Sequence, residues 1–118
     1  MGIEMTDNGD AESKSIQIAT QVIIHAGNAR SLVFEAFKDI EGSKYPACEE
    51  KLAQAGDEIS AAHNVQTELI QAEARGEDVR LTLLLTHAQD TLMIAMSERL
   101  VAQRLAALVQ NLEKKLQH

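Results

Sequence analysis

A histidine and an aspartate three residues apart, His87 and Asp90, form the pair in this sequence best suited to chemistry. On a helix, residues three apart share a face, so these two side chains would point the same way. A neutral imidazole near pH 7 can act as a general base, a metal ligand or a nucleophile. The two residue types alone leave all three roles open.

The surroundings of this pair are unusual for polar side chains. Residues at alternating steps of four and three form a seam like that of a coiled coil: Leu83, His87, Asp90, Ile94, Ser97, Val101, Arg104 and Leu108. A histidine and an aspartate in the middle of an apolar seam cost free energy unless a partner satisfies them. Such breaks in a local pattern are expected at functional sites.

Other kinds of site find little support. The chain has no Cys-x-x-Cys, His-x-x-x-His or Glu-x-x-His motif and no glycine-rich phosphate loop, which argues against zinc, di-iron and nucleotide sites. The single cysteine, Cys48, fits a reducing compartment and is interpreted as a small buried hydrophobe. Of the other histidines, His25 is interpreted as a helix-edge residue and His63 as a structural, hydrogen-bonded one; His118 is the last residue.

Length and composition indicate one all-α domain. The 118 residues contain 3% aromatic residues and one proline, and they are rich in alanine, leucine, glutamine and glutamate, which favour helices. The formal net charge of −7 argues against nucleic acid and against an anionic membrane surface as partners. No apolar run of about 18 residues occurs, so no membrane-spanning helix is expected.

Three helices are predicted, after a polar and aperiodic tail over residues 1–14 that we expect to be disordered. Apolar residues recur at steps of three and four from residue 16, and Gly42 is placed to end this helix in a left-handed conformation. Ser43 is placed to cap the second helix, whose first turn holds Pro46. A turn at residues 75–78 follows, and Asp78 is the expected cap of a third helix that begins near Val79.

The third helix is apolar on nearly every side, as its segments 83–85 and 92–96 illustrate. A surface helix of a monomeric protein carries one apolar stripe, whereas a helix that is apolar all round is buried all round. Three helices from one chain cannot cover it fully. Residues 15–118 are therefore predicted to form an antiparallel three-helix bundle whose third helix packs against further chains.

Three segments together resemble a known family. The sequence Leu-Thr-His-Ala-Gln-Asp-Thr-Leu-Met at residues 85–93 is similar to the signature of the lactose/cellobiose-type IIA component of the phosphotransferase system, which reads His-Ala/Gly-Gln-Asp-His-Leu-Met. Residues 26–31, Ala-Gly-Asn-Ala-Arg-Ser, and residues 62–67, Ala-His-Asn-Val-Gln-Thr, resemble its first-helix and second-helix motifs. The three segments fall in order, one per helix, and span nearly the whole chain from residue 16.

This resemblance implies a cytoplasmic phosphocarrier that assembles as a homotrimer through coiled-coil-like packing. It implies that His87 accepts a phosphoryl group from phospho-HPr, through its Nε2 nitrogen. It also implies that the group passes to a cysteine of the cognate IIB component during uptake of a lactose/cellobiose-type sugar. Finally, it implies that three Asp90 carboxylates share a Mg²⁺ ion at the threefold axis.

One position departs from the family signature, since its second histidine is Thr91 here, so no helper role in phosphotransfer carries over. From proximity alone, Gln89 or Thr91 is expected to donate to the phosphoryl oxygens. Two other classes stay open: a structural oligomerisation protein in which His87 and Asp90 set the register of a seam, and an enzyme that uses them as a general-base pair. Which sugar is moved is not encoded, because the resemblance implies that a IIA protein passes its phosphoryl group to IIB and takes no direct part in transporting the sugar.

Overall fold

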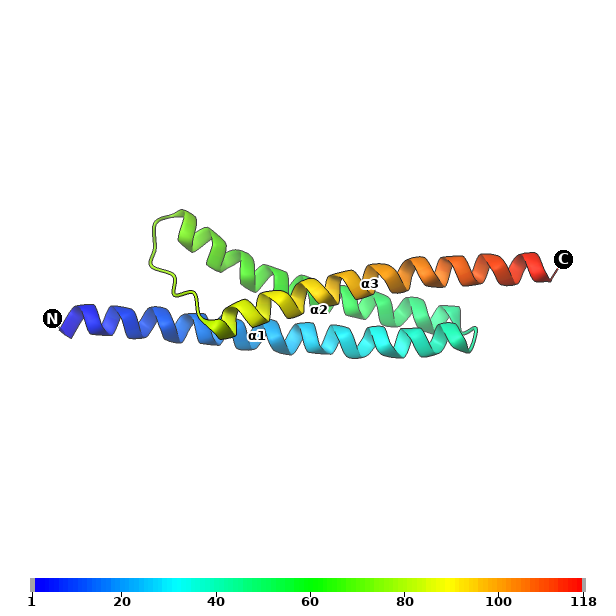
Figure 1. Ribbon diagram of the computed structural model, residues 1–118, viewed down its shortest axis with the longest axis horizontal. Coiled ribbons are helices and arrows are strands. Elements are labelled where there is room, and N and C mark those ends of the chain that lie inside the picture. Colours follow the sequence, from blue (N-terminus) through cyan, green and yellow to red (C-terminus); the bar gives the residue numbers. More distant parts are fainter. Residues whose placement is uncertain (1, 118) are drawn as a thin grey trace.

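Three long helices make up the protein. The computed structural model describes the backbone of residues 2–117 and the side chains of residues 9–117. Helix α1 spans Gly2–Glu41, α2 spans Tyr45–Ala74 and α3 spans Leu83–Leu116, and they run up, down and up along a molecule of 76 × 21 × 19 Å (Figure 1). Within the described residues there is no β-strand. The predicted all-α, antiparallel three-helix bundle is therefore confirmed for the single chain.

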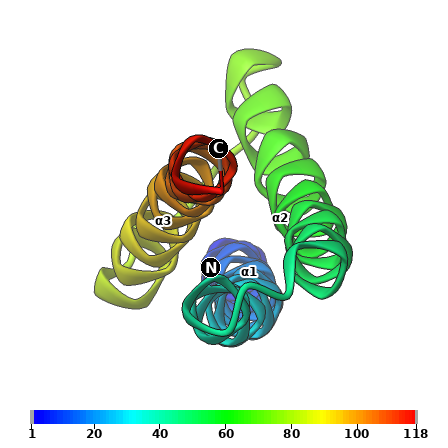
Figure 2. The ribbon, with the colours of Figure 1, turned by 90° about the vertical axis from the view of Figure 1, so that its right-hand side faces the viewer.

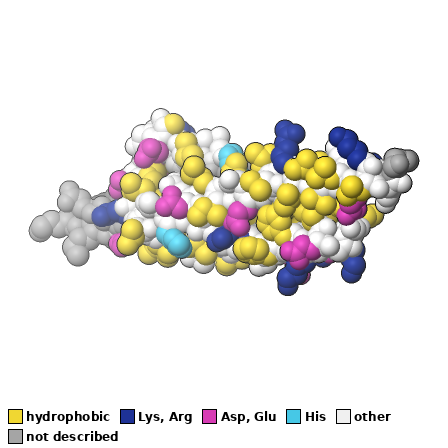
Figure 3. Space-filling model, turned by 45° about the vertical axis from the view of Figure 1, so that its right-hand side comes forward, with side chains coloured by type: hydrophobic (Ala, Val, Ile, Leu, Met, Phe, Trp, Pro, Cys, Tyr) yellow, Lys and Arg dark blue, Asp and Glu magenta, His cyan; other side chains and the backbone are white. Residues whose placement is uncertain are grey.

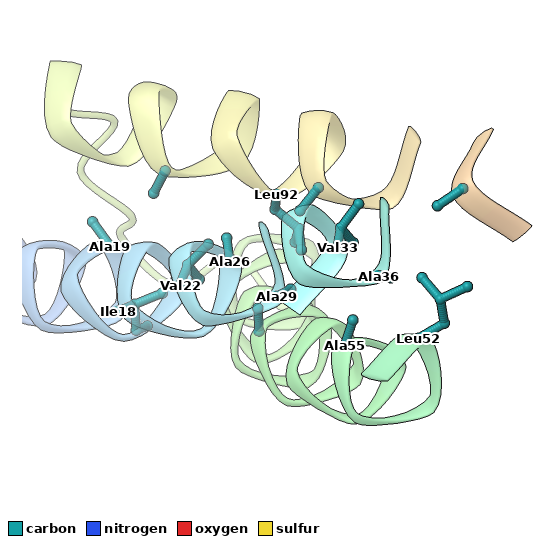
Figure 4. Packing of buried hydrophobic residues seen from close by; sticks show 14 of the residues in the cluster. Ile18, Ala19, Val22, Ala26, Ala29, Val33, Ala36, Leu52, Ala55 and Leu92 are labelled. Atoms are coloured by element: carbon teal, nitrogen blue, oxygen red, sulfur yellow. The ribbon is translucent and has the colours of Figure 1, made fainter. Parts of the chain in front are cut away.

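The core is built largely from alanine. Small side chains let helix backbones approach closely, and the larger Val22, Val33 and Leu92 fill the space that remains (Figure 4). Leu85 is likewise buried. The fully buried alanines come from all three helices: Ala19, Ala26, Ala29, Ala36, Ala55, Ala62, Ala88, Ala95 and Ala102. Helix α1 lies against both other helices, whereas α2 and α3 diverge toward the loop that connects them (Figures 1 and 2).

The turn between α1 and α2 differs in detail from its prediction. Helix α1 ends at Glu41, as expected, but the left-handed residue is Ser43, with φ 57°, and not Gly42. This geometry lets the Lys44 N–H bond the carbonyl of Asp39, five residues back, at 2.8 Å, which closes the helix in a Schellman motif. Ser43 consequently does not cap α2. Its hydroxyl instead donates to Glu113 Oε1 at 2.6 Å.

The connection between α2 and α3 is longer than predicted. Helix α2 ends at Ala74, and Gly76, two residues beyond it, has a left-handed φ of 85°, but α3 begins at Leu83 and not near Val79. Its cap is Thr82, whose Oγ1 accepts from Leu85 N at 3.0 Å, so the predicted cap at Asp78 is wrong. The cause is tertiary. The fully buried Ser15 hydroxyl of α1 donates to the Arg80 carbonyl at 2.6 Å and holds the segment before Thr82 out of the helix.

The N-terminal segment also differs from its prediction. Helix α1 passes through residues 2–14, which the sequence pattern assigned to a disordered tail. Once a helix is nucleated, each further residue adds one backbone hydrogen bond, so a packed helix can extend beyond its core contacts. The side chains of residues 9–14 are mostly exposed, which agrees with the missing apolar period in that segment.

Candidate functional site

His87 lies in the second turn of α3, where two neighbours hold the helix against the core. Leu85 and Ala88 are buried, at 1% and 0% exposure. The Thr82 cap fixes the start of the helix at Leu83. The His87 side chain projects from the same turn and is exposed. Its ring makes no hydrogen bond to any residue whose side chain the structure describes. The imidazole is therefore free to meet an external group.

Of the two predicted phosphoryl contacts, only one shares the face of His87. Thr91 lies one turn further on, and its hydroxyl donates to the His87 carbonyl at 2.9 Å. Its single proton is thus used within the helix, which leaves the hydroxyl oxygen as an acceptor. Gln89 is two residues from His87, and side chains at that spacing do not face each other on a helix. The single chain does not bring Gln89 to His87.

Asp90 projects from α3 with an exposed side chain. It makes no hydrogen bond or ion pair to residues 9–117. No group of three or more His, Cys, Asp or Glu side chains in that range could hold a metal ion. A divalent cation such as Mg²⁺ requires about six oxygen ligands, so one carboxylate is not a site. Any metal centre at Asp90 would need ligands from other molecules.

Hydrophobic side chains cover the outer face of α3, the side turned away from α1 and α2. They gather on the half of the molecule that holds the C-terminal part of this helix (Figure 3). Its exposed members are Leu83, Met93, Ile94, Leu100, Val101, Leu105, Leu108 and Leu112. A monomeric soluble protein rarely leaves so continuous an apolar surface in water. His87 and Asp90 stand at the N-terminal end of this outer face, as the seam in the sequence predicted.

Two further histidines lie elsewhere. His25 of α1 is half-buried, with its Nδ1 2.7 Å from Glu58 Oε2 of α2, and Asn28 reaches the same oxygen at 3.4 Å. His25 therefore joins α1 to α2. His63 is exposed on α2, with its Nδ1 3.4 Å from Thr67 Oγ1.

Cys48 is fully buried in α2, as predicted. Burial raises the pKa of its thiol, and the carboxylates of Asp39 and Glu49 add to this effect. A thiol with a raised pKa stays protonated and is a poor nucleophile. The interpretation of Cys48 as a small core residue is confirmed.

The sequence patterns missed one contact within a recognised motif. Arg30, in the segment 26–31, donates from Nε to Glu98 Oε1 at 2.6 Å and so ties α1 to α3. Nothing in the spacing along either helix marks this pair, because its members are 68 residues apart.

Among the described residues, no helix is long and apolar enough to cross a membrane.

Comparison with protein families gives one match over most of the chain. Residues 17–110 match the model described as the lactose/cellobiose-specific IIA subunit of the phosphotransferase system. The lichenan-specific phosphotransferase enzyme IIA component of Bacillus subtilis is 43% identical over 96 residues, which are 81% of this chain and 87% of the relative. The N,N'-diacetylchitobiose-specific component of Escherichia coli is 30% identical over 114 residues, covering 96% of this chain and 98% of that protein.

Solved structures agree with these relatives. A crystal structure of the cellobiose-specific enzyme IIA from Bacillus anthracis superposes with a TM-score of 0.80 at 42% identity, covering 84% of this chain and 91% of that one. The chitobiose IIA of Escherichia coli, solved in complex with HPr, gives a TM-score of 0.72 at 32% identity, covering 82% and 94% of the two chains. Sequence and fold thus point to the same group of proteins.

Proposed function

The chain belongs to the lactose/cellobiose-specific IIA family of the phosphotransferase system, and on that premise we propose that His87 is the residue that carries the phosphoryl group. The protein is a phosphocarrier of a sugar phosphotransferase system. It receives a phosphoryl group from phospho-HPr and passes it to the IIB component during uptake of a lactose/cellobiose-type sugar. The observation that carries the assignment of His87 is its exposed ring within the segment His-Ala-Gln-Asp.

The transfer needs little chemistry beyond a free nitrogen. The Nε2 lone pair of His87 attacks the phosphorus of phospho-HPr, an N–P bond forms, and the bond from phosphorus to the HPr histidine breaks. A cysteine thiolate of IIB then takes the phosphoryl group and leaves His87 neutral again. Because the transition state is loose, positioning and electrostatics do most of the work. A histidine whose ring bonds no side chain of residues 9–117 suits this role.

We further propose that the working form is a homotrimer built on the outer face of α3. Support comes from the exposed apolar side chains along that face and from their coiled-coil spacing. In a parallel arrangement of three copies, Asp90 would face the axis, and three carboxylates would converge. Like charges that close require a shared cation or protonation. We assign this place to a Mg²⁺ ion held by three Asp90 carboxylates, and the assembly to the cytoplasm.

The phosphorylation of His87 is tested with enzyme I, HPr and phosphoenolpyruvate. One phosphate per chain should appear, stable in base and labile in acid, and His87→Ala should abolish it. The matched controls His25→Ala and His63→Ala remove the other two histidines within the described helices and should keep at least part of the labelling. Full labelling of the His87→Ala protein would contradict the assignment. An unlabelled native protein would favour a purely structural role.

The metal and the trimer are tested together by chelation. Near neutral pH, a chelator should lower the melting temperature of the native trimer, and this sensitivity should shrink toward pH 5 as protonation replaces the cation. Asp90→Leu substitutes an apolar layer of similar size, so it should remain trimeric, ignore the chelator and still accept phosphate. Sedimentation of the native protein as a monomer would refute the trimer.

A further inference from the structure

A cleft between α2 and α3 lies on the opposite side of α3 from the outer apolar face. It holds about 330 Å³, within the range of small-molecule sites. Its walls are apolar where Leu52 of α2 meets Ala106 of α3, and polar groups stand along it: Tyr45, Glu49, Arg99, Gln103 and Gln110. No step of phosphotransfer at His87 uses these residues.

The guanidinium of Arg99 is fixed at one end of this cleft. Its Nε donates to the Leu52 carbonyl of α2 at 2.7 Å. It also lies flat on α2 at Gly56, where a Cβ would come within 2.7 Å of Nη2. A glycine inside a helix is less stable than alanine, so this position gives up helix stability to make room for the guanidinium. No carboxylate in residues 9–117 pairs with Arg99, and its two Nη groups are free to bind an anion.

The other end of the cleft has the opposite character. The Tyr45 hydroxyl is buried beside the Ser43 hydroxyl and the Glu113 carboxylate, which bond each other. Burial, with help from the Glu113 carboxylate, raises the pKa of the Tyr45 phenol, so it keeps a proton to donate. Glu49 lines this end of the cleft and Glu113 lies beside the phenol, so this end repels an anion, whereas the phenol can donate to a neutral oxygen.

The separation of the two ends sets the size of a ligand. Tyr45 and Leu52 are seven residues apart on one helix, which corresponds to about 10 Å. A ligand that satisfies both ends therefore carries an oxyanion on one side and neutral hydroxyl or ether oxygens about 10 Å away. We propose that the cleft between α2 and α3 binds a sugar of about disaccharide size that carries a phosphate or a carboxylate, with the oxyanion on Arg99 and a sugar oxygen on Tyr45.

This site would let the carrier sense a phosphorylated sugar, the product class of the transport that it serves. That biological role rests on the proposed function, but the binding itself does not. It is measured by calorimetric titration of the unphosphorylated full chain, with no partner protein present. Loss of phosphotransfer at His87 and loss of ligand binding are therefore separate outcomes.

The titration uses cellobiose 6-phosphate, cellobionate, cellobiose and inorganic phosphate at low ionic strength. At least one of the two charged sugars should bind, and whichever binds more tightly identifies the oxyanion. Neutral cellobiose and phosphate alone should bind at least about tenfold more weakly, because each lacks one of the two ends. Equal binding of cellobiose and its phosphate would overturn the proposal, as would no binding by either charged sugar.

Two variants locate the ligand, and a third is the matched control. Arg99→Met should weaken binding about tenfold or more, whereas Arg75→Met removes an exposed arginine beyond the far end of α2 and should change affinity less than twofold. Tyr45→Phe removes only the phenol hydroxyl and keeps the ring, so it should leave the chain folded, with unchanged helical circular dichroism, yet weaken binding several-fold. Unchanged affinity in both Arg99→Met and Tyr45→Phe would place the ligand elsewhere and refute the site.

Discussion

The inner and outer faces of α3 are built from different side chains, although both are apolar. The inner face carries Ala88, Ala95 and Ala102 between larger residues, and all three alanines are fully buried. On the outer face stand Ile94, Val101 and Leu108, of which about half of each side chain remains exposed: 47%, 55% and 56%. Small residues let α3 lie close to α1, so the inner face completes the fold of the chain. The outer face carries large apolar side chains that remain exposed in the single chain. Such a surface is typical of a face that packs against another protein chain.

His87 and Asp90 lie where the two kinds of surface meet. Leu85, two residues before His87, and Ala88, directly after it, are both buried. The His87 side chain itself is exposed. Asp90 faces outward in the same stretch. The inner face thus fixes the backbone of the site, while the outer face decides what approaches it. Substitutions that act on one face alone can separate these two contributions.

The largest expected effect comes from a charge on the outer face. Ile94→Asp places a carboxylate in a layer that the proposed trimer repeats three times, so three charges would be buried together. The variant should sediment as a monomer, at about one third of the native mass, and keep its helical circular dichroism because Ile94 is no part of the chain's own core. A variant that remains fully trimeric would show that the outer face is not the interface.

The matched change on the inner face is Ala95→Leu, one residue further along. Its extra methylenes have no space between α3 and α1, and overpacking of this kind costs about 1–3 kcal/mol. Here the free energy of unfolding of the chain itself should fall, whatever the assembly state. If both variants lowered chain stability equally, the division of α3 into a folding face and an assembly face would be wrong.

A smaller difference in stability is expected between alanine substitutions at two helical glycines, Gly27 of α1 and Gly56 of α2. A Cβ at Gly27 meets nothing within 4 Å, so Gly27→Ala should stabilise the chain by up to about 1 kcal/mol through helix propensity. At Gly56 the same gain is offset, because the new Cβ displaces Arg99 and its hydrogen bond to Leu52, worth about 1 kcal/mol. Chemical denaturation should therefore show Gly56→Ala near neutral.

Introducing Gly56→Ala into the Arg99→Ala variant tests whether Arg99 causes this difference in stability. With the guanidinium absent, Gly56→Ala should recover the full stabilisation that Gly27→Ala shows. A Gly56→Ala variant that stabilises as much in the native background as in Arg99→Ala would mean that Arg99 does not occupy the space above the glycine.

The smallest effect concerns the ion pair between Lys51 and Asp39, 2.7 Å apart near the turn that joins α1 to α2. The hydrogen bond to Asp39 raises the pKa of Lys51 above that of a free lysine. Its contribution to stability is thus complete below pH 10 and is lost as the pH rises through the raised value. The melting temperature of the native protein should exceed that of Lys51→Met at pH 8, and the difference should shrink as the pH rises past the pKa of a free lysine. A constant difference would exclude titration of this lysine as the cause.

Much of the fold followed from periodicity along the chain. Apolar steps of three and four residues mark one helix face without reference to any other helix, which is why three helices and the outer seam of α3 could be predicted. The segment around His87 was recognisable for a similar reason, because a motif of neighbouring residues is written in local order. The exposure of His87 in the single chain agrees with its seam position, which lies away from the alanines that pack inward.

Other features depended on residues far apart in the sequence. The start of α3 at Leu83 depends on the bond from Ser15 to Arg80, and the left-handed Ser43 completes a turn and reaches Glu113. The place of Arg99 over Gly56 likewise exists only once α2 and α3 are packed. The amino-acid sequence by itself determined which faces are apolar and which residues could react, since both are properties of a single helix. Only the tertiary structure decided where helices end and which polar groups meet, because those choices are made between partners 40 to 70 residues apart.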